Sequence, residues 1–278
     1  MKENDKEMYE PELVFYAGSA LLEGPVWDSV HQLMYCVSIP DEIIYRINPK
    51  TTEVITYQTD GPVGAAVLDN EGMLLSAEKS GIYRINPETK KRTFVAHPNT
   101  DDRMRYNDGK LLPNGHFLIG TMGDPEIIDG AAKLFVIDRQ ETKELLTGLT
   151  IANGIGWTED EQSIYHIDTP TKKVRQFTYD GDTKTLSDEK VVVEITDDSS
   201  PDGMCVDVDG KLWVAEYGGS KVCKWNPETG SKELEIKMPA TNVTSCCLGG
   251  EHLEYLYITT AKKDGEPLSG GLFRVKLR

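Results

Sequence analysis

The sequence contains no apolar run that approaches the length of a membrane-spanning helix. Cationic residues are also scarce, because 30 Lys and Arg residues stand against 46 Asp and Glu residues, a net charge of −16. Such an acidic surface repels phosphate backbones and anionic lipid, so nucleic acid and membrane surfaces are poor candidate partners. Only five cysteines are present, at spacings that match neither a CxxC motif nor a zinc pattern. We therefore expect free thiols.

The N-terminal segment lacks the apolar core of a signal peptide. Together with the unpaired cysteine spacing, this predicts a cytoplasmic protein. We expect residues 1–11 to form a flexible tail and residues 12–278 to form one domain. Two smaller domains are the competing interpretation for a chain of 278 residues, but no linker supports a division.

Two kinds of segment repeat along the chain. The outer kind is clearest in Tyr45-Arg-Ile-Asn-Pro and Tyr83-Arg-Ile-Asn-Pro, and its copies begin at residues 45, 83, 134, 174, 222 and 272. The inner kind is a turn followed by a hairpin, with copies near residues 23, 64, 107, 153, 202 and 245. Repeats of roughly 40 to 50 residues with four strands each are typical of a β-propeller. The sequence predicts an all-β, six-bladed propeller of four-stranded blades.

The last repeat is one strand short, because only one clear strand follows Leu272. The segment from Glu12 to Gly18 reads as a strand without a repeat of its own. Pairing these two segments would close the ring and cover two exposed sheet edges. We therefore expect the N-terminal strand to complete the last blade.

The stretch from Ser200 to Tyr217 shows the inner repeat most clearly. It begins with Ser200-Pro-Asp-Gly, which we interpret as a turn, and continues as an apolar strand from Met204. Asp209-Gly210 then reverses the chain into a second strand, as Asp-Gly between β-rich runs does. This places Asp202 just before the first strand, beside a Gly that allows close backbone approach.

Residues at that position in different blades would meet at one mouth of the central channel. They are Glu23, Gly64, the pair Asn107-Asp108, Asn153, Asp202 and Ser245. Carboxylate and amide oxygens without His or Cys suit Ca²⁺, Mg²⁺ or Mn²⁺ rather than structural zinc. Taken singly, each Asp-Gly or Asn-Gly is explained by turn geometry instead. Glu23 weakens that alternative, because Glu is not a favoured turn residue.

Seven motifs in order resemble those of the regucalcin (senescence marker protein)/gluconolactonase family over about residues 14–276. They are Leu22-Glu-Gly-Pro-Val-Trp, Arg105-Tyr-Asn-Asp-Gly-Lys, Gly120-Thr-Met, Ala152-Asn-Gly-Ile-Gly-Trp, Pro201-Asp-Gly-Met-Cys, Gly210-Lys-Leu-Trp-Val-Ala and Thr244-Ser-Cys-Cys. The resemblance implies a six-bladed propeller, one divalent metal ion in the channel and hydrolysis of sugar lactones. It favours Ca²⁺, with Mg²⁺, Mn²⁺ or Zn²⁺ as alternatives.

The resemblance also implies roles for individual residues. Glu23, Asn153 and Asp202 match the family's metal ligands, and Asp202 also matches its proposed general base. Arg105 and Asn107 match a substrate-facing Arg-x-Asn. The family's vertebrate members carry a substrate-contacting Glu shortly after Gly-Thr-Met, where this chain has Pro125. Asp124 and Glu126 are the candidates to replace it.

We therefore expect a metal-dependent lactonase that acts on a small-molecule lactone as a monomer or weak homo-oligomer. The alternatives are a calcium-binding or ligand-binding propeller without turnover, and a phosphotriester hydrolase that uses the same site. A His-based hydrolase is disfavoured, because no Gly-x-Ser-x-Gly motif is present and no histidine falls at an equivalent position. We expect surface or strand-end locations for the five histidines, which are His31, His97, His116, His166 and His252.

Overall fold

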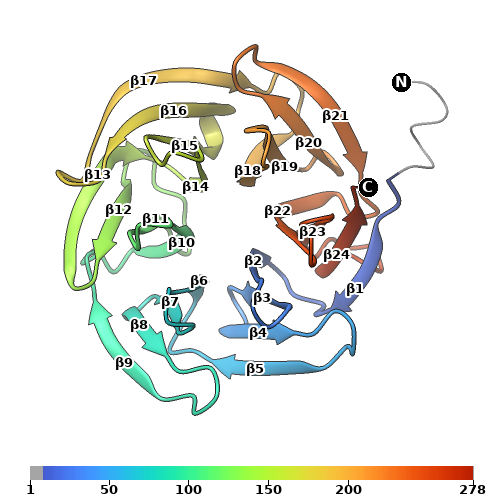
Figure 1. Ribbon diagram of the computed structural model, residues 1–278, viewed down its shortest axis with the longest axis horizontal. Coiled ribbons are helices and arrows are strands. Elements are labelled where there is room, and N and C mark those ends of the chain that lie inside the picture. Colours follow the sequence, from blue (N-terminus) through green and yellow to red (C-terminus); the bar gives the residue numbers. More distant parts are fainter. Residues whose placement is uncertain (1–8, 278) are drawn as a thin grey trace.

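The computed structural model describes residues 9–277, which form six four-stranded antiparallel sheets arranged in a ring (Figure 1). Four sheets are separate, and an eight-stranded sheet contains the other two, joined through the pair Tyr217–Asn242. The predicted β-propeller is therefore confirmed. Of the expected tail at residues 1–11, residues 1–8 lie outside the described residues.

Each blade runs from an innermost strand at the channel to a fourth strand at the rim (Figure 1). The innermost strands are β2 (Leu22–Asp28), β6 (Val63–Leu68), β10 (Met104–Leu111), β14 (Ala152–Trp157), β18 (Ser200–Val206) and β22 (Asn242–Gly249). The second strands are β3 (Leu33–Ser38), β7 (Leu74–Glu78), β11 (Phe117–Gly123), β15 (Ser163–Asp168), β19 (Leu212–Tyr217) and β23 (Tyr255–Ala261). The third strands are β4 (Ile43–Ile47), β8 (Gly81–Ile85), β12 (Ala132–Asp138), β16 (Lys173–Asp180), β20 (Lys221–Asn226) and β24 (Gly271–Lys276). The fourth strands are β5 (Val54–Gln58), β9 (Arg92–Ala96), β13 (Glu141–Leu149), β17 (Thr185–Glu194), β21 (Ser231–Lys237) and β1 (Glu12–Tyr16).

Burial decreases from the channel to the rim. Strand β10 is buried along nearly its whole length, whereas β13 in the same blade is mostly exposed. The third strands carry the Tyr-Arg-Ile type of sequence, in which apolar and polar residues alternate, as expected for half-buried strands. Besides strands, the assigned elements include the short 3₁₀ helix η2 (Thr169–Thr171). Among residues 9–277, no helix has the length and apolar character needed to cross a membrane.

Strand β1 completes the last blade, as the sequence predicts. It pairs antiparallel with β24, and Glu12 forms an ion pair with Arg274 at 2.8 Å. On its other side, Phe15 packs against Tyr45 of the first blade with ring centroids 5.1 Å apart. The two ends of the chain therefore hold the first and last blades together.

All six innermost strands share one irregularity. In each, the pairing register with the second strand shifts near the start of the strand, at the same place in every blade. Such β-bulges bend a strand and redirect its side chains. The shifts lie next to Glu23, Gly64, Asn107, Asn153, Asp202 and Ser245.

Neighbouring blades approach one another closely at these bulges. A Cβ atom on Gly64 would lie 2.4 Å from the carbonyl oxygen of Asn107, and one on Gly203 would lie 2.4 Å from the Cβ of Ser245. The Asn107 amide donates to the carbonyl of Ala152 at 3.0 Å, which joins the third and fourth blades. Backbone and side chains of adjacent innermost strands thus meet where the candidate ligands lie.

Candidate metal centre and substrate site

The three proposed metal ligands come from three different blades. Glu23 lies in β2, Asn153 in β14 and Asp202 in β18, and their exposed fractions are only 6%, 5% and 7%. Each stands beside the bulge of its strand. The charge of Asp202 raises the pKa of Glu23, and Asn153 lies near enough to Asp202 to affect the pKa of that carboxyl group. The structure therefore brings the three side chains together.

The local prediction for Asp202 was wrong in one respect. Ser200-Pro-Asp-Gly is not a turn before the strand but the first part of β18 itself. Asp202 and Gly203 lie at the register shift between Pro201 and Met204, opposite β19. A bulge gives the same result as the expected turn, since it aims Asp202 out of the regular strand pattern. The second predicted turn is confirmed, because the Gly210 amide donates to the Asp207 carbonyl at 2.9 Å.

Asn153 is oriented by a contact that crosses blades. Its Nδ2 donates to Thr169 Oγ1 at 3.0 Å, and that hydroxyl donates to the Pro201 carbonyl at 2.9 Å. This leaves Asn153 Oδ1 buried without a hydrogen-bond partner among the described residues. Sequence reasoning missed Thr169, because nothing in its local sequence marks a contact between β14 and β18.

Asp202 and Glu23 also present oxygen atoms to the site. Asp202 Oδ1 is buried and has no partner among the described residues, whereas Glu23 Oε2 accepts from the Gly24 amide at 2.8 Å. Buried polar atoms are nearly always satisfied, so an unpartnered carboxylate oxygen and an unpartnered amide oxygen from neighbouring blades leave unused capacity to bind a ligand here.

The electrostatics of the two carboxyl groups support the same conclusion. Burial raises the pKa of Glu23 well above its usual value, and the charge of Asp202 adds to the shift. Burial likewise raises the pKa of Asp202. Two buried carboxyl groups that share a site resist ionising together, so each makes it harder for the other to lose its proton. A divalent cation would relieve this repulsion.

Asp108 is a third buried carboxyl group that faces this site. Both of its oxygens are buried without a partner in the part of the chain that the structure describes. Burial raises its pKa, and the charge of Lys110 opposes the shift. Its own charge raises the pKa of both Glu23 and Asp202. The channel therefore contains three buried acidic groups, and the charge of Asp108 acts on the other two.

The donor set fits a hard divalent cation. Two carboxylates and an amide oxygen are ligands of the kind that Ca²⁺ and Mg²⁺ prefer. Within residues 9–277, no group of three His, Cys, Asp or Glu side chains is arranged to hold a metal ion. The candidate set lies outside that class, because its third member is Asn153.

Arg105 brings a positive charge to the same region. Its Nη1 donates to the Tyr106 carbonyl and to Asn107 Oδ1, both at 2.9 Å. Asn107 thus uses its oxygen to hold Arg105 and its amide to bind Ala152. No partner is found for the other guanidinium nitrogens among the described residues, so they remain available to an anionic or hydroxyl-bearing ligand.

The structure separates the two candidate carboxylates after Gly-Thr-Met. Asp124 is half-buried. Burial lowers the pKa of Arg105, and the charge of Asp124 is the largest influence that opposes this lowering. Its Oδ2 also accepts from Lys79 Nζ at 2.8 Å. Glu126 is exposed on the surface. Asp124 is therefore the one whose carboxylate lies near the site.

The histidines lie elsewhere, although the expectation of surface positions was wrong for His166. It is fully buried in the middle of β15, where burial and then the charge of Arg175 lower its pKa to about 3. A neutral imidazole can be buried at far lower cost than a charged one, which explains this position.

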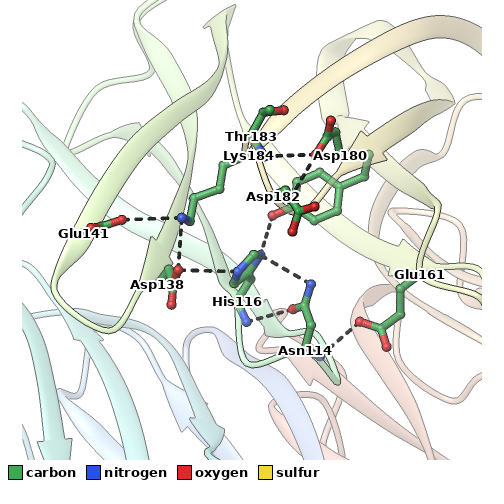
Figure 2. Close-up of polar contacts among 10 residues, drawn as sticks. Asn114, His116, Asp138, Glu141, Glu161, Asp180, Asp182, Thr183 and Lys184 are labelled. Atoms are coloured by element: carbon green, nitrogen blue, oxygen red, sulfur yellow. Dashed lines mark hydrogen bonds and ion pairs between the residues drawn. The ribbon is translucent and has the colours of Figure 1, made fainter.

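His116 is also buried, at the strand end that the sequence predicts. Figure 2 shows it between Asn114, Asp138 and Lys184, and its Nδ1 lies 2.7 Å from the Tyr179 hydroxyl. Burial lowers its pKa, which the nearby Asp138 partly offsets. These contacts join the third and fourth blades, so the role of His116 is to hold two blades together.

Comparisons with known proteins agree with this architecture. Residues 21–262 match the model of the SMP-30/Gluconolactonase/LRE-like region. Regucalcin of Xenopus laevis is 32% identical over 268 residues, which cover 91% of this chain and 89% of that protein. A calcium-binding protein, regucalcin, from Agrobacterium tumefaciens superposes with a TM-score of 0.90 at 21% identity, covering 97% of this chain and 96% of that one. A gluconolactonase from Xanthomonas campestris superposes with a TM-score of 0.79 at 18% identity, covering 97% and 90%.

Proposed function

Because the chain belongs to the SMP-30/gluconolactonase/LRE-like family, we propose that it is a divalent-metal-dependent lactonase acting on sugar-acid or similar lactones. The observation that carries the proposal is the pair of buried, unpartnered oxygens, Asn153 Oδ1 and Asp202 Oδ1, beside Glu23. A propeller used only as a scaffold has no need to bury these groups together with Arg105.

Glu23, Asn153 and Asp202 would hold the cation, with Ca²⁺ as the first choice. When bound, such a cation supplies Lewis-acid stabilisation of negative charge on the lactone oxygen. The buried setting of all three ligands strengthens these electrostatic interactions, because little water screens them.

The other steps fall to side chains of this chain. Asp202 accepts the proton of the attacking water with the carboxylate oxygen that does not hold the cation. Arg105 orients the substrate through its free guanidinium donors, and Asn107 fixes Arg105 for this task. Asp124 accepts a hydrogen bond from a sugar hydroxyl close to Arg105. Opening of the ester then yields a hydroxy acid.

The test is a panel of sugar lactones and phosphotriesters, assayed with metal-free protein to which Ca²⁺, Mg²⁺, Mn²⁺ or Zn²⁺ is added in turn. We expect metal-dependent hydrolysis of at least one lactone. Hydrolysis of phosphotriesters alone would replace the proposed substrate class. Calcium binding in calorimetry without any turnover would reject the enzyme and leave a binding protein.

Two matched variants assign the substrate contact. Asp124→Asn and Glu126→Gln each remove one carboxylate from the same loop, one near Arg105 and one exposed. We expect Asp124→Asn to raise KM for the lactone and Glu126→Gln to leave both kcat and KM unchanged. The opposite result would move the substrate-contacting role to Glu126.

A further inference from the structure

Three of the five cysteines lie on innermost strands around the channel. Cys205 is in β18, and Cys246 and Cys247 are adjacent in β22 of the next blade. The Sγ atoms of Cys205 and Cys246 are 3.8 Å apart, and both thiols are free. No role in metal binding or substrate binding uses these side chains.

Strand geometry explains why only one of the adjacent pair faces Cys205. Successive side chains of a strand point in opposite directions. Cys246 points toward the fifth blade, where its Sγ lies 3.3 Å from the carbonyl oxygen of Trp213. Cys247 points toward the first blade, where its Sγ lies 4.0 Å from the sulfur of Met34. Cys247 is thus a natural control for Cys246.

Cys205 is reached from a cavity of about 1040 Å³. The cavity is lined by residues that follow the bulges, such as Val26 and Ile155, and by hairpin-turn residues such as Gly210 and Gly250. It therefore opens at the end of the channel away from Glu23 and Asp202. Cys205 is half-buried and borders this space, whereas Cys246 is fully buried behind it.

We propose that Cys205 and Cys246 form an oxidation-sensitive dithiol, which a hydroperoxide entering the cavity converts into a disulfide between the fifth and sixth blades. The Cys205 thiolate attacks the peroxide, takes up one oxygen as a sulfenic acid and releases the other as water or alcohol. The Cys246 sulfur then displaces the sulfenic oxygen as water. Two thiols lose two electrons and two protons, and the peroxide is reduced.

Lys110 supplies the charge that this chemistry needs. It borders the same cavity, and its side chain is more than nine-tenths buried. Although burial lowers its pKa, the Asp108 carboxyl and the three thiols raise it overall, so Lys110 remains a cation. A cation beside the reacting thiol stabilises the negative charge that develops on the departing oxygen of the peroxide. Burial raises the pKa of Cys246, which therefore reacts second, as the resolving thiol.

The backbone already holds the two sulfurs within reach of a bond. A disulfide requires an S–S distance of about 2.05 Å, so the observed 3.8 Å must close by rotation of the side chains. The strands that carry them approach closely nearby, since a Cβ on Gly203 would lie 2.8 Å from the Cα of Ser245. Little backbone movement is therefore needed.

The experiment uses the reduced full-length protein treated with hydrogen peroxide. Before treatment, thiol counting in denaturant should find all five thiols free. Afterwards we expect two thiols to be lost, the intact mass to fall by two hydrogen atoms, and a non-reducing digest to contain a peptide linking Cys205 to Cys246. Dithiothreitol should restore all thiols. A wild-type digest that links Cys246 to Cys247, or shows no linked peptide, would overturn the proposal.

Variants separate the roles of the residues. Cys246→Ser should stop at a sulfenic acid on Cys205 that dimedone traps, and Cys205→Ser should lose no thiol at this site. Cys247→Ser should still form the disulfide, and Lys110→Met should form it severalfold more slowly. Unchanged oxidation in Cys205→Ser contradicts the assignment. If that variant does not fold, the wild-type peptide map decides the question alone.

Discussion

Asp202→Asn and Glu23→Gln should each stabilise the metal-free protein at alkaline pH while impairing its activity. Burial raises the pKa of both carboxyl groups, and the charge of Asp202 adds to the shift of Glu23. The folded protein therefore binds more protons at this site than the unfolded chain does. Its free energy of unfolding falls as pH rises from about 4, the ordinary carboxyl range, through the raised pKa values of the folded state.

The size of the effect follows from the pKa shifts. Each unit by which a carboxyl pKa is raised costs the ionised folded state about 1.4 kcal/mol, so removing one charge should stabilise the metal-free protein by at least about 1 kcal/mol at pH 8. Near pH 4 the same substitutions should have little effect, because the wild-type carboxyl groups are then protonated. Urea unfolding in the presence of a chelator at the two pH values measures the difference.

Activity distinguishes the two residues. Both substitutions remove one negative ligand, so both should weaken metal binding. Asp202 is also the proposed acceptor of the water's proton, a role worth about 10²–10⁴-fold in rate, or about 3–5 kcal/mol of activation free energy. Saturating metal should therefore restore most of the turnover of Glu23→Gln and little of that of Asp202→Asn.

Lactone hydrolysis measured against metal concentration, with calorimetric metal titration of each variant, tests this reasoning. Near wild-type turnover of Asp202→Asn at saturating metal would show that Asp202 is only a ligand, and Asp108 would become the candidate base. Variants that are less stable than the metal-free wild type at pH 8 would refute the electrostatic argument itself.

Three further outcomes concern the scaffold. Deletion of residues 1–18 removes β1 from the last blade and should give an aggregation-prone protein, and a melting temperature within about two degrees of wild type would contradict the closure by β1. Gly64→Ala should destabilise by about 1–3 kcal/mol in urea unfolding, because its Cβ would lie 2.4 Å from backbone atoms. Gly181→Ala, whose nearest contact is 3.4 Å, is the matched control, and equal effects would refute the argument. His166 has a pKa lowered from 6.5 to about 3, so its contribution to stability is present above 6.5 and is lost as pH falls toward 3. His166→Gln should remove that part of the acid dependence while His252→Gln, at an exposed position, should keep it, as urea unfolding across this range will show.

The propeller could be predicted because its information is local and repeated. The Tyr-Arg-Ile-Asn-Pro segments at residues 45 and 83 mark third strands that begin at Ile43 and Gly81. The missing strand after Leu272 and the unassigned strand at Glu12 were enough to predict their pairing. Each inference needed only strand periodicity and a count of repeats.

The sequence supplied the residues of the candidate site but not their local geometry. An Asp-Gly pair favours a turn, and only the pairing of β18 with β19 shows that Asp202 lies at a bulge inside a strand. Thr169 and Lys110 could not be identified from the sequence, because their importance comes from contacts between blades. His166 was misplaced for a similar reason, since its burial depends on the blade around β15.

The bulges also explain why equivalent positions in six blades provide only three proposed ligands. At these points each innermost strand must contact the next blade as well as face the channel. In the second blade, Gly64 is so close to the backbone of the third that no side chain fits. In the sixth, the side chain of Ser245 fills the space left by Gly203. Both polar groups of the Asn107 side chain are already hydrogen-bonded, the oxygen to Arg105 and the amide nitrogen to Ala152. The bond to Ala152 joins two blades. Glu23, Asn153 and Asp202 each keep an oxygen that is not hydrogen-bonded to the next blade, as does Asp108 beside Asn107, so the asymmetry of the site follows from how the ring packs.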